Sequence, residues 1–139
     1  AAENEEQAFY EGRGHDEWIA ALEPIGTNAS KPHLTDAPWL IVIFAERYGF
    51  NTDGSRRKNY YVNESVGIAT GFLISAIHNA GLVCLTHTPS PMKFLNSMCK
   101  RPVNEKPIMI LPLGYAGEGA TIPEASTNKK PLREIMSIF

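Results

Sequence analysis

Cysteine is scarce in this sequence, with Cys84 and Cys99 as its two examples. Two cysteines among apolar neighbours cannot build a disulfide framework, and we expect both to be reduced, buried thiols. No segment approaches the roughly 18 uninterrupted apolar residues of a membrane-spanning helix. The net charge is only −2, which gives no general attraction to nucleic acid or to anionic membranes. What remains is the composition of about one ordinary globular domain.

Motifs for a catalytic metal or a nucleotide are lacking as well. The four histidines, at positions 15, 33, 78 and 87, form no HExxH pattern and no ligand set with the cysteines, so we expect no metal site. Neither cysteine has the surroundings of a catalytic nucleophile. Residues 114–119 are rich in glycine and follow an apolar run, but Ala-Thr-Ile-Pro comes next instead of a helix. That order excludes a Rossmann or P-loop interpretation.

Apolar periodicity divides the chain into helices, strands and one long loop. Residues 2–23 predict two helices with a break at Gly12 to Gly14, and residues 24–38 predict a surface loop. The continuous β-prone run at 39–44 predicts an inner strand with both faces covered. Further strands are predicted at 82–85 and 108–113, where Pro112 indicates a bulge or a strand end, and a short helix at 92–98.

Residues 61–81 form the clearest helix of the sequence. Apolar residues cover much of its circumference, which predicts burial on more than one side. Gly67 and Gly71 permit the close approach of another backbone, and Gly81 suits the left-handed position that ends a helix. Two interpretations stay open: a central core helix, or a core helix that also forms the seam of a twofold dimer.

The loop at residues 85–91 is the most informative segment. Thr86 and Thr88 flank His87, and Pro89 follows, immediately after a short predicted strand. Such a loop can direct polar hydrogens toward a planar heteroaromatic ligand. The alternative is a polar turn that caps the helix predicted at 92–98.

Several stretches, in matching order and spacing, resemble the nitroreductase superfamily and, within it, the iodotyrosine deiodinase branch. They lie at residues 59–69, 79–82, 86–89, 100–107, 113–115, 120–123 and 130–132. No single motif would suffice, but the ordered set is specific and covers nearly all of the chain. The resemblance implies an α+β fold with a mixed sheet flanked by helices, in a domain-swapped homodimer that binds FMN at its interface.

The same resemblance indicates that part of the domain precedes Ala1. In this family an Arg-Arg-Ser-x-Arg segment near the domain start holds the flavin phosphate, and a Ser/Gly-rich loop follows it; this sequence contains neither. The chain also begins without methionine, at residues typical of the middle of a helix. We therefore expect a partial nitroreductase-like FMN domain at 1–139, with a substrate lid at 1–36. Residues 37–139 would form a core with the flavin loop and a C-terminal tail.

The resemblance also implies a set of substrate-binding residues in the lid. The family's carboxylate, phenol and ammonium fall on Glu6, Tyr10 and Lys31. Glu6 would meet the ammonium of an amino acid and Lys31 its carboxylate, while Tyr10 adds a hydroxyl and a ring. Glu6 and Tyr10 lie four residues apart and hence on one helix face. The plain alternative is that Glu6 and Lys31 are ordinary surface charges. We also expect the lid to be disordered without substrate, because it has few core anchors.

For the flavin, the resemblance implies Thr86, His87, Thr88 and Lys129. The hydroxyl of Thr88 would reach flavin N5, where a hydrogen bond favours one-electron steps, and Thr88 is therefore the expected catalytic residue. His87 stands where relatives can carry threonine and would make its contact through the backbone N–H. Lys129 stands where the family has an arginine for the FMN phosphate; lysine keeps the charge and loses the bidentate geometry.

The implied function is the FMN-dependent reductive dehalogenation of a halotyrosine by an oxidoreductase that is a homodimer. The implied partner is a small-molecule substrate, with no nucleic acid and no membrane contact in this segment. Two alternatives stay open: a general NAD(P)H-dependent nitroreductase or quinone reductase, and a non-catalytic fragment or flavin-binding protein. We expect a cytoplasmic location, with a membrane anchor in a preceding segment left open.

Overall fold

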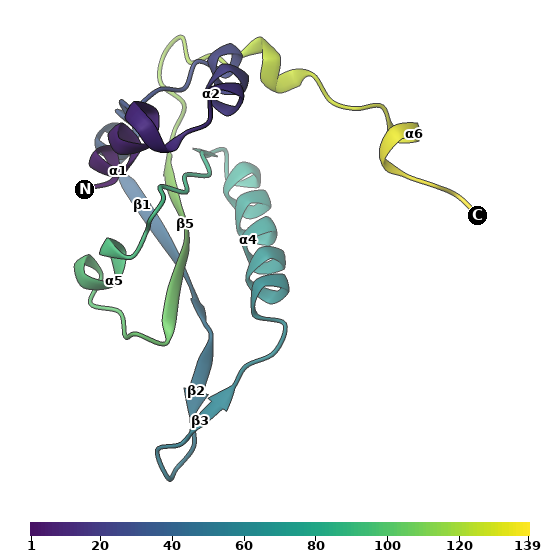
Figure 1. Ribbon diagram of the computed structural model, residues 1–139. Helices are drawn as coiled ribbons and strands as arrows, with labels where there is room; N and C mark the ends of the chain where they lie inside the picture. The colour runs from purple at the N-terminus through teal and green to yellow at the C-terminus, as the bar shows by residue number, and fades with distance from the viewer.

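An antiparallel pair of long strands runs through the middle of the computed structural model, which describes residues 1–139 (Figure 1). β1 (Trp39–Glu46) pairs with β5 (Glu105–Gly114), and β4 (Val83–Cys84) pairs with the opposite edge of β5. The sheet order is therefore β1-β5-β4. The buried core follows β5, where Leu111 is fully buried and Ile110 nearly so. A separate hairpin of β2 (Tyr48–Phe50) and β3 (Arg56–Lys58) continues beyond the far end of β1.

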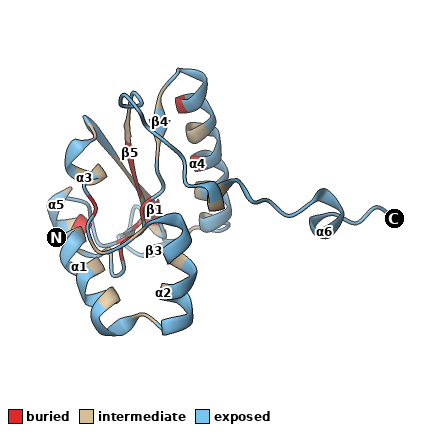
Figure 2. Cartoon of the chain, turned by 90° about the horizontal axis from the view of Figure 1, so that it is seen from above, coloured by how far each residue is buried: buried red, intermediate tan, exposed pale blue.

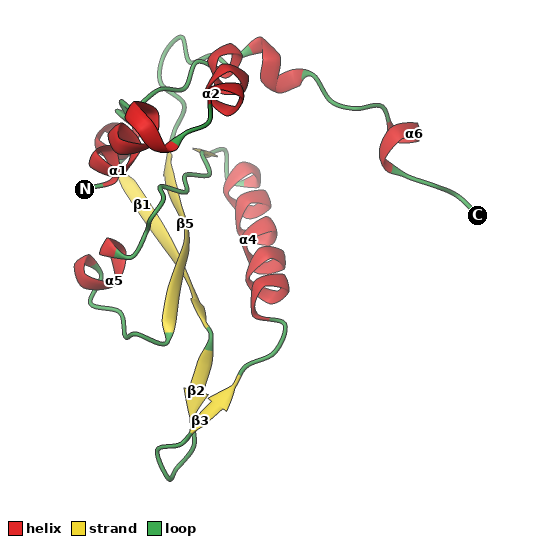
Figure 3. Cartoon of the chain, viewed as in Figure 1, coloured by secondary structure: helices red, strands yellow, loops and turns green.

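Helices surround the strands on two sides and at one end. α4 (Val62–Asn79) and α5 (Phe94–Met98) flank the strands from opposite sides (Figures 1 and 2). At the end where β1 begins lie α1 (Ala2–Ala8), the π-helical η1 (Phe9–Arg13), α2 (Asp16–Leu22), η2 (Glu23–Ile25) and α3 (His33–Asp36). After β5 the chain passes through η3 (Glu124–Thr127) and runs outward through α6 (Leu132–Ile135), as Figure 3 shows. No helix of the structure combines the length and the apolar character needed to cross a membrane.

The α+β class is confirmed, and so are most of the predicted elements. The helical break predicted at Gly12 to Gly14 is present, and the end of α4 at Gly81 takes the predicted form. Gly81 has φ +77°, its N–H donates to His78 O at 2.9 Å, and the Leu82 N–H donates to Ile77 O at 3.1 Å. This pair of hydrogen bonds is the Schellman motif, which satisfies carbonyls that the helix itself leaves free. Where the sequence predicted a mixed sheet, each pairing within this chain is antiparallel.

The prediction of an inner strand at residues 39–44 is wrong within this chain. β1 pairs with β5 alone, so it lies at the edge of the sheet, and Trp39 and Leu40 are exposed. β5 takes the central place because it is the strand that pairs on both sides. A continuous apolar run shows that a segment can be covered on both faces but does not specify which strands pair with it.

Burial of α4 on more than one side is also not found within this chain. Thr70 and Ile77 are its buried residues, whereas Ile68 and Phe72 face outward and are exposed. A Cβ added at Gly67 or Gly71 would meet nothing within 4 Å. No backbone of this chain therefore approaches the two glycines, and the outer apolar stripe of α4 is uncovered (Figure 2). Cys84 and Cys99, which were predicted to be reduced and buried, are free thiols but are only half-buried.

The sheet irregularity predicted at Pro112 lies elsewhere. Ile43 pairs with Met109 and Phe44 with Pro107, so Ile108 is the extra residue of the bulge. Pro112 sits in regular pairing opposite Leu40, and its carbonyl accepts the Leu85 N–H at 3.2 Å. Proline has no backbone N–H to donate but keeps its carbonyl, and at this position of β5 the carbonyl is the group that forms the hydrogen bond.

Candidate functional site

The three predicted lid residues lie together at the end of the sheet. Lys31 Nζ is 3.4 Å from Glu6 Oε2 and 5.5 Å from the centroid of the Tyr10 ring. α1 and the π-helical turn after it carry Glu6 and Tyr10, and the loop before α3 brings Lys31 to them. Lys31 is only 5% exposed. The structure thus gathers a carboxylate, an ammonium and an aromatic ring in one partly buried place, rather than leaving them as scattered surface charges.

Further polar groups hold Lys31 in this position. Its Nζ donates to Thr27 Oγ1 at 2.9 Å and to the carbonyl of Asn28, and its backbone N–H donates to Glu3 Oε1 at 2.9 Å. Glu3 and Glu6 are one helical turn apart, so α1 binds the same lysine at its backbone and at its side chain. The sequence reasoning missed Glu3 and Thr27. The three-residue spacing of Glu3 and Glu6 could have indicated their common face, but nothing local pointed to Thr27.

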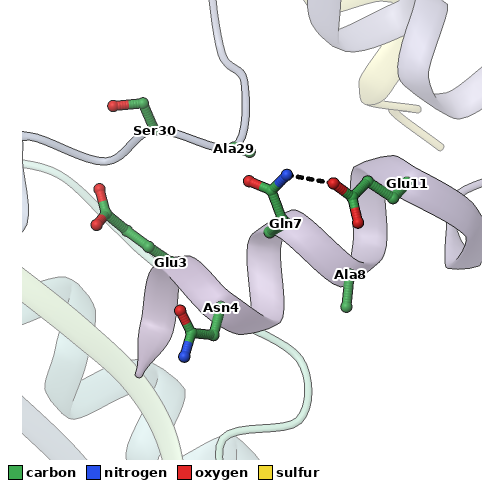
Figure 4. A pocket seen from close by; sticks show the side chains of 7 residues that line it. All are labelled: Glu3, Asn4, Gln7, Ala8, Glu11, Ala29 and Ser30. Carbon is green, nitrogen blue, oxygen red and sulfur yellow. Dashed lines mark hydrogen bonds between the residues drawn. The ribbon is translucent and has the colours of Figure 1, made fainter.

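A polar hollow of about 580 Å³ lies between α1 and the loop at Ala29 and Ser30 (Figure 4). It is lined by Glu3, Asn4, Gln7, Ala8, Glu11, Ala29 and Ser30. Gln7 donates a hydrogen bond to Glu11 across its floor. None of the three predicted lid residues lines this hollow, so it is separate from the Lys31 cluster. Glu3 alone joins the two, because its carboxylate accepts the Lys31 N–H.

The predicted flavin loop continues the sheet by one pairing beyond β4. The His87 N–H donates to Ile110 O at 2.9 Å and the Ile110 N–H donates to His87 O at 2.8 Å. Alternation along an extended backbone then separates the side chains. His87 is turned inward and is 6% exposed, while Thr86 and Thr88 are exposed. The expectation that the His87 N–H contacts a flavin is therefore corrected, since this N–H is already bonded within the sheet.

Thr88 borders a cavity of about 920 Å³. Four basic side chains share the lining with Thr88 and Ser90, namely Arg47, Lys93, Arg101 and Lys106. Arg101 also forms an ion pair with Glu105 in which its guanidinium hydrogen bonds raise its own pKa and lower the pKa of the Glu105 carboxyl. Exposed hydroxyls beside a positively charged cavity fit the donor set that an anionic, planar cofactor requires.

Lys129, the predicted phosphate ligand, does not join this group. It is exposed, lies between η3 and α6, and is not among the residues that line the Thr88 cavity. The segment between η3 and α6, which contains Lys129, leads away from the strands (Figure 1). The physical reason is that the residues of α6 and those that follow it are all exposed, so no buried apolar anchor ties this part of the tail to the sheet.

Two histidines connect the predicted lid to the predicted flavin loop. The His33 and His87 rings meet edge to face, with centroids 5.3 Å apart and an interplanar angle of 72°. Burial lowers the pKa of both imidazoles below the ordinary 6.5, and the charge of Lys31 lowers both further, against the opposing effect of Glu6. The sequence reasoning missed His33, which no motif or periodicity distinguishes.

Comparison with known proteins places these features in a family. No family model matches the chain. The iodotyrosine deiodinase of Haliscomenobacter hydrossis is 55% identical over 130 residues, which cover 94% of this chain and 59% of that protein. A crystal structure of oxidized iodotyrosine deiodinase bound to FMN and 3-iodo-L-tyrosine aligns with a TM-score of 0.72 at 27% identity, covering 87% of this chain and 60% of that one. A nitroreductase family protein from Clostridium difficile 630 shares the fold, with a TM-score of 0.55 at 23% identity, over 88% of this chain and 68% of that one.

The chain thus has a nitroreductase fold, of which it covers part. Its sequence makes it an iodotyrosine deiodinase-like member of the nitroreductase superfamily. The family resemblance stated from the sequence motifs is confirmed. The chain spans about half the length of the curated relatives it matches.

Proposed function

We propose that the protein containing this chain is an FMN-dependent oxidoreductase that removes halogen reductively from a halotyrosine. The observation that carries the proposal is the cluster of Glu6, Lys31 and Tyr10, in which opposite charges lie 3.4 Å apart beside an aromatic ring. Relatives at 55% and 46% identity bear the name iodotyrosine deiodinase, and the solved neighbour binds 3-iodo-L-tyrosine. Both the charges and the likeness favour an amino acid as substrate.

The cluster suits a zwitterion for an electrostatic reason. The substrate ammonium would bind the Glu6 carboxylate, and the substrate carboxylate would bind the Lys31 ammonium. On binding, Glu6 and Lys31 would each give up the other as a partner and pair with an opposite charge of the substrate, so no unpaired charge is buried. Tyr10 would cover the bound molecule from the side of α1. Residues 1–36 would act as the lid over a core formed by residues 37–139.

FMN, when bound, would supply the electrons for loss of halide. The Thr88 hydroxyl would donate a hydrogen bond to the flavin edge, and Thr86 lies on the same exposed side of the loop. His87 would serve the loop indirectly, because its backbone holds the loop to Ile110. The basic side chains around the Thr88 cavity would attract the anionic cofactor. Lys129 is proposed as a phosphate ligand on the family resemblance alone.

The proposal extends to assembly, donor and location. A homodimer with α4 at its seam is supported by the exposed Ile68 and Phe72 and by the open space at Gly67 and Gly71. A cytoplasmic location is supported by two free cysteines. NAD(P)H is the proposed external donor, by resemblance. A general nitroreductase or quinone reductase is the second candidate, because the fold is shared with a nitroreductase family protein.

One substitution separates the two candidates. Glu6→Gln removes the charge that would bind the substrate ammonium, and a hydrogen bond to a charged group contributes about 1.5–3 kcal/mol, so kcat/KM for iodotyrosine should fall roughly 10- to 100-fold. Quinone reduction should be unchanged, because a quinone has no ammonium. Glu5→Gln is the matched control, since Glu5 is a neighbouring lid carboxylate that pairs with the exposed Arg13 instead. Equal loss of both activities in Glu6→Gln would favour the general reductase, and a protein that retains no FMN would favour a non-catalytic role.

A further inference from the structure

An aromatic contact joins the segment proposed as a lid to the sheet. His87 is 6% exposed, and two backbone hydrogen bonds to Ile110, at 2.9 and 2.8 Å, hold it in the sheet. His33 belongs to α3, two residues beyond Lys31. The edge-to-face contact of the two rings at 5.3 Å therefore bears directly on where Lys31 lies relative to the sheet.

The surroundings of the contact favour the neutral form of both rings. Nε2 of His33 and Nε2 of His87 are buried, and neither has a hydrogen-bond partner. A neutral imidazole can carry its proton on Nδ1 and leave Nε2 without one. An imidazolium has a proton on both nitrogens, so protonation would bury an N–H donor without an acceptor, at a cost of about 1–3 kcal/mol or more.

The charges that face the pair come from three parts of the lid. They are Glu3 and Glu6 on α1, Lys31 in the loop, and Asp36 on α3. The carboxylates favour an imidazolium, while Lys31 opposes it at both histidines and the His33 ring opposes it at His87. Burial is the largest influence at both histidines, and the balance lowers both pKa values.

We propose that His33 and His87 are positioning residues, which dock the lid on the flavin loop through contact of their neutral rings and release it when either ring is protonated. The docking itself is a property of this chain. Its effect on substrate binding deepens the proposed function and rests on it, because undocking would carry Glu6, Tyr10 and Lys31 together away from the flavin loop.

The direction of the pH dependence follows from linkage. The histidine pKa values are lowered when the lid is docked and return toward 6.5 when it opens, so the docked lid binds fewer protons. Docking is then fully present above pH 6.5 and weakens as the pH falls from 6.5 toward the lowered pKa values. The docking constant should fall by up to about tenfold per pH unit for each histidine in that interval.

Hydrogen exchange measured by mass spectrometry tests the docking directly. Protection of residues 1–36 and of residues 37–139 would be compared between about pH 7.5 and about pH 5, after correction for the intrinsic pH dependence of exchange. His87→Phe keeps a planar ring at the contact and cannot be protonated. His78→Gln is the matched control, because it removes an exposed histidine that lies on α4. His33→Phe makes the same test from the other side of the contact and replaces His87→Phe should that variant not fold.

We expect the unaltered chain and His78→Gln to lose protection at 1–36 in acid while residues 37–139 stay protected. His87→Phe should lose clearly less of its lid protection in acid, because His33 is then the one ring of the pair that can still be protonated. In turnover, KM for iodotyrosine should rise in acid in the unaltered protein while kcat changes less, and His87→Phe should reduce that rise. Acid loss of lid protection that is equal in His87→Phe, or absent from the unaltered chain, would overturn the proposal. A lid that responds as expected in a protein that does not dehalogenate iodotyrosine would overturn the proposed function and leave the docking intact.

Discussion

The ion pair between Glu6 and Lys31 should stabilise the proposed lid by an amount that a double-mutant cycle can measure. The perturbations are Glu6→Gln, Lys31→Met and the two together. The charged atoms are 3.4 Å apart, and the side chains are 15% and 6% exposed. At this separation the attraction is roughly 1 kcal/mol in water and roughly 5 kcal/mol at an effective dielectric constant of 20. Because desolvation opposes it, we expect a coupling energy of about 2 kcal/mol.

The assay is the protection of residues 1–36 against hydrogen exchange at neutral pH. A coupling of about 2 kcal/mol corresponds to roughly thirtyfold in protection beyond the sum of the single variants. Each single substitution should loosen the lid, because it leaves one buried charge without its partner. The double variant should recover part of the loss.

The chain provides an internal reference for this experiment. Glu5 and Arg13 form a second ion pair in the same lid at 3.1 Å, but their side chains are 32% and 44% exposed. Exposed pairs couple by less than about 1 kcal/mol, so this cycle should give the smaller value despite its shorter distance. A Glu6 and Lys31 coupling no larger than that of Glu5 and Arg13 would refute the argument that burial strengthens the lid pair.

Three further predictions concern the core, a helix end and the carboxyl of an ion pair. Leu111→Ala, at the fully buried centre of β5, should lower the free energy of unfolding by about 3–4 kcal/mol in urea denaturation; a loss below about 1 kcal/mol would show that β5 is not the core. Gly81→Ala should cost about 1–2 kcal/mol, since φ is +77° with open space for the new Cβ, and Gly81→Asn should cost less. The Glu105 carboxyl should titrate below its ordinary 4.5 in NMR, because the hydrogen bond from Arg101 lowers its pKa. The stability that this ion pair gives to the folded chain is present above pH 4.5 and is lost as the pH falls through the lowered pKa. Arg101→Gln should return the midpoint toward 4.5, and an unchanged midpoint would contradict this cause.

Elements that depend on neighbouring residues could be predicted from the sequence. α4 and its ending at Gly81 follow from apolar spacing and from the one residue type that tolerates the left-handed conformation without strain. Strand β5 follows from its continuous apolar run. The common face of Glu6 and Tyr10 likewise follows from their spacing within a helical segment.

Features that depend on pairing between distant segments could not be predicted in this way. β1 has the composition of an inner strand, but its place at the edge is decided by which strands pair with β5. The approach of Lys31 to Glu6 was expected from the family resemblance and not from any local pattern. The contact of His33 with His87 links segments far apart in the sequence, and neither residue belongs to a periodic apolar face.

The open side of β1 has a consequence for the behaviour of this chain in solution. An edge strand presents unpaired backbone donors and acceptors that a strand of another molecule can extend, and residues 39–44 contain neither charge nor proline. The bulge at Ile108 bends this pair of strands, and Glu46 adds a charge at its end; both are features that discourage fibrillar stacking. Colloidal stability in concentrated solution will therefore depend on how well this edge is shielded.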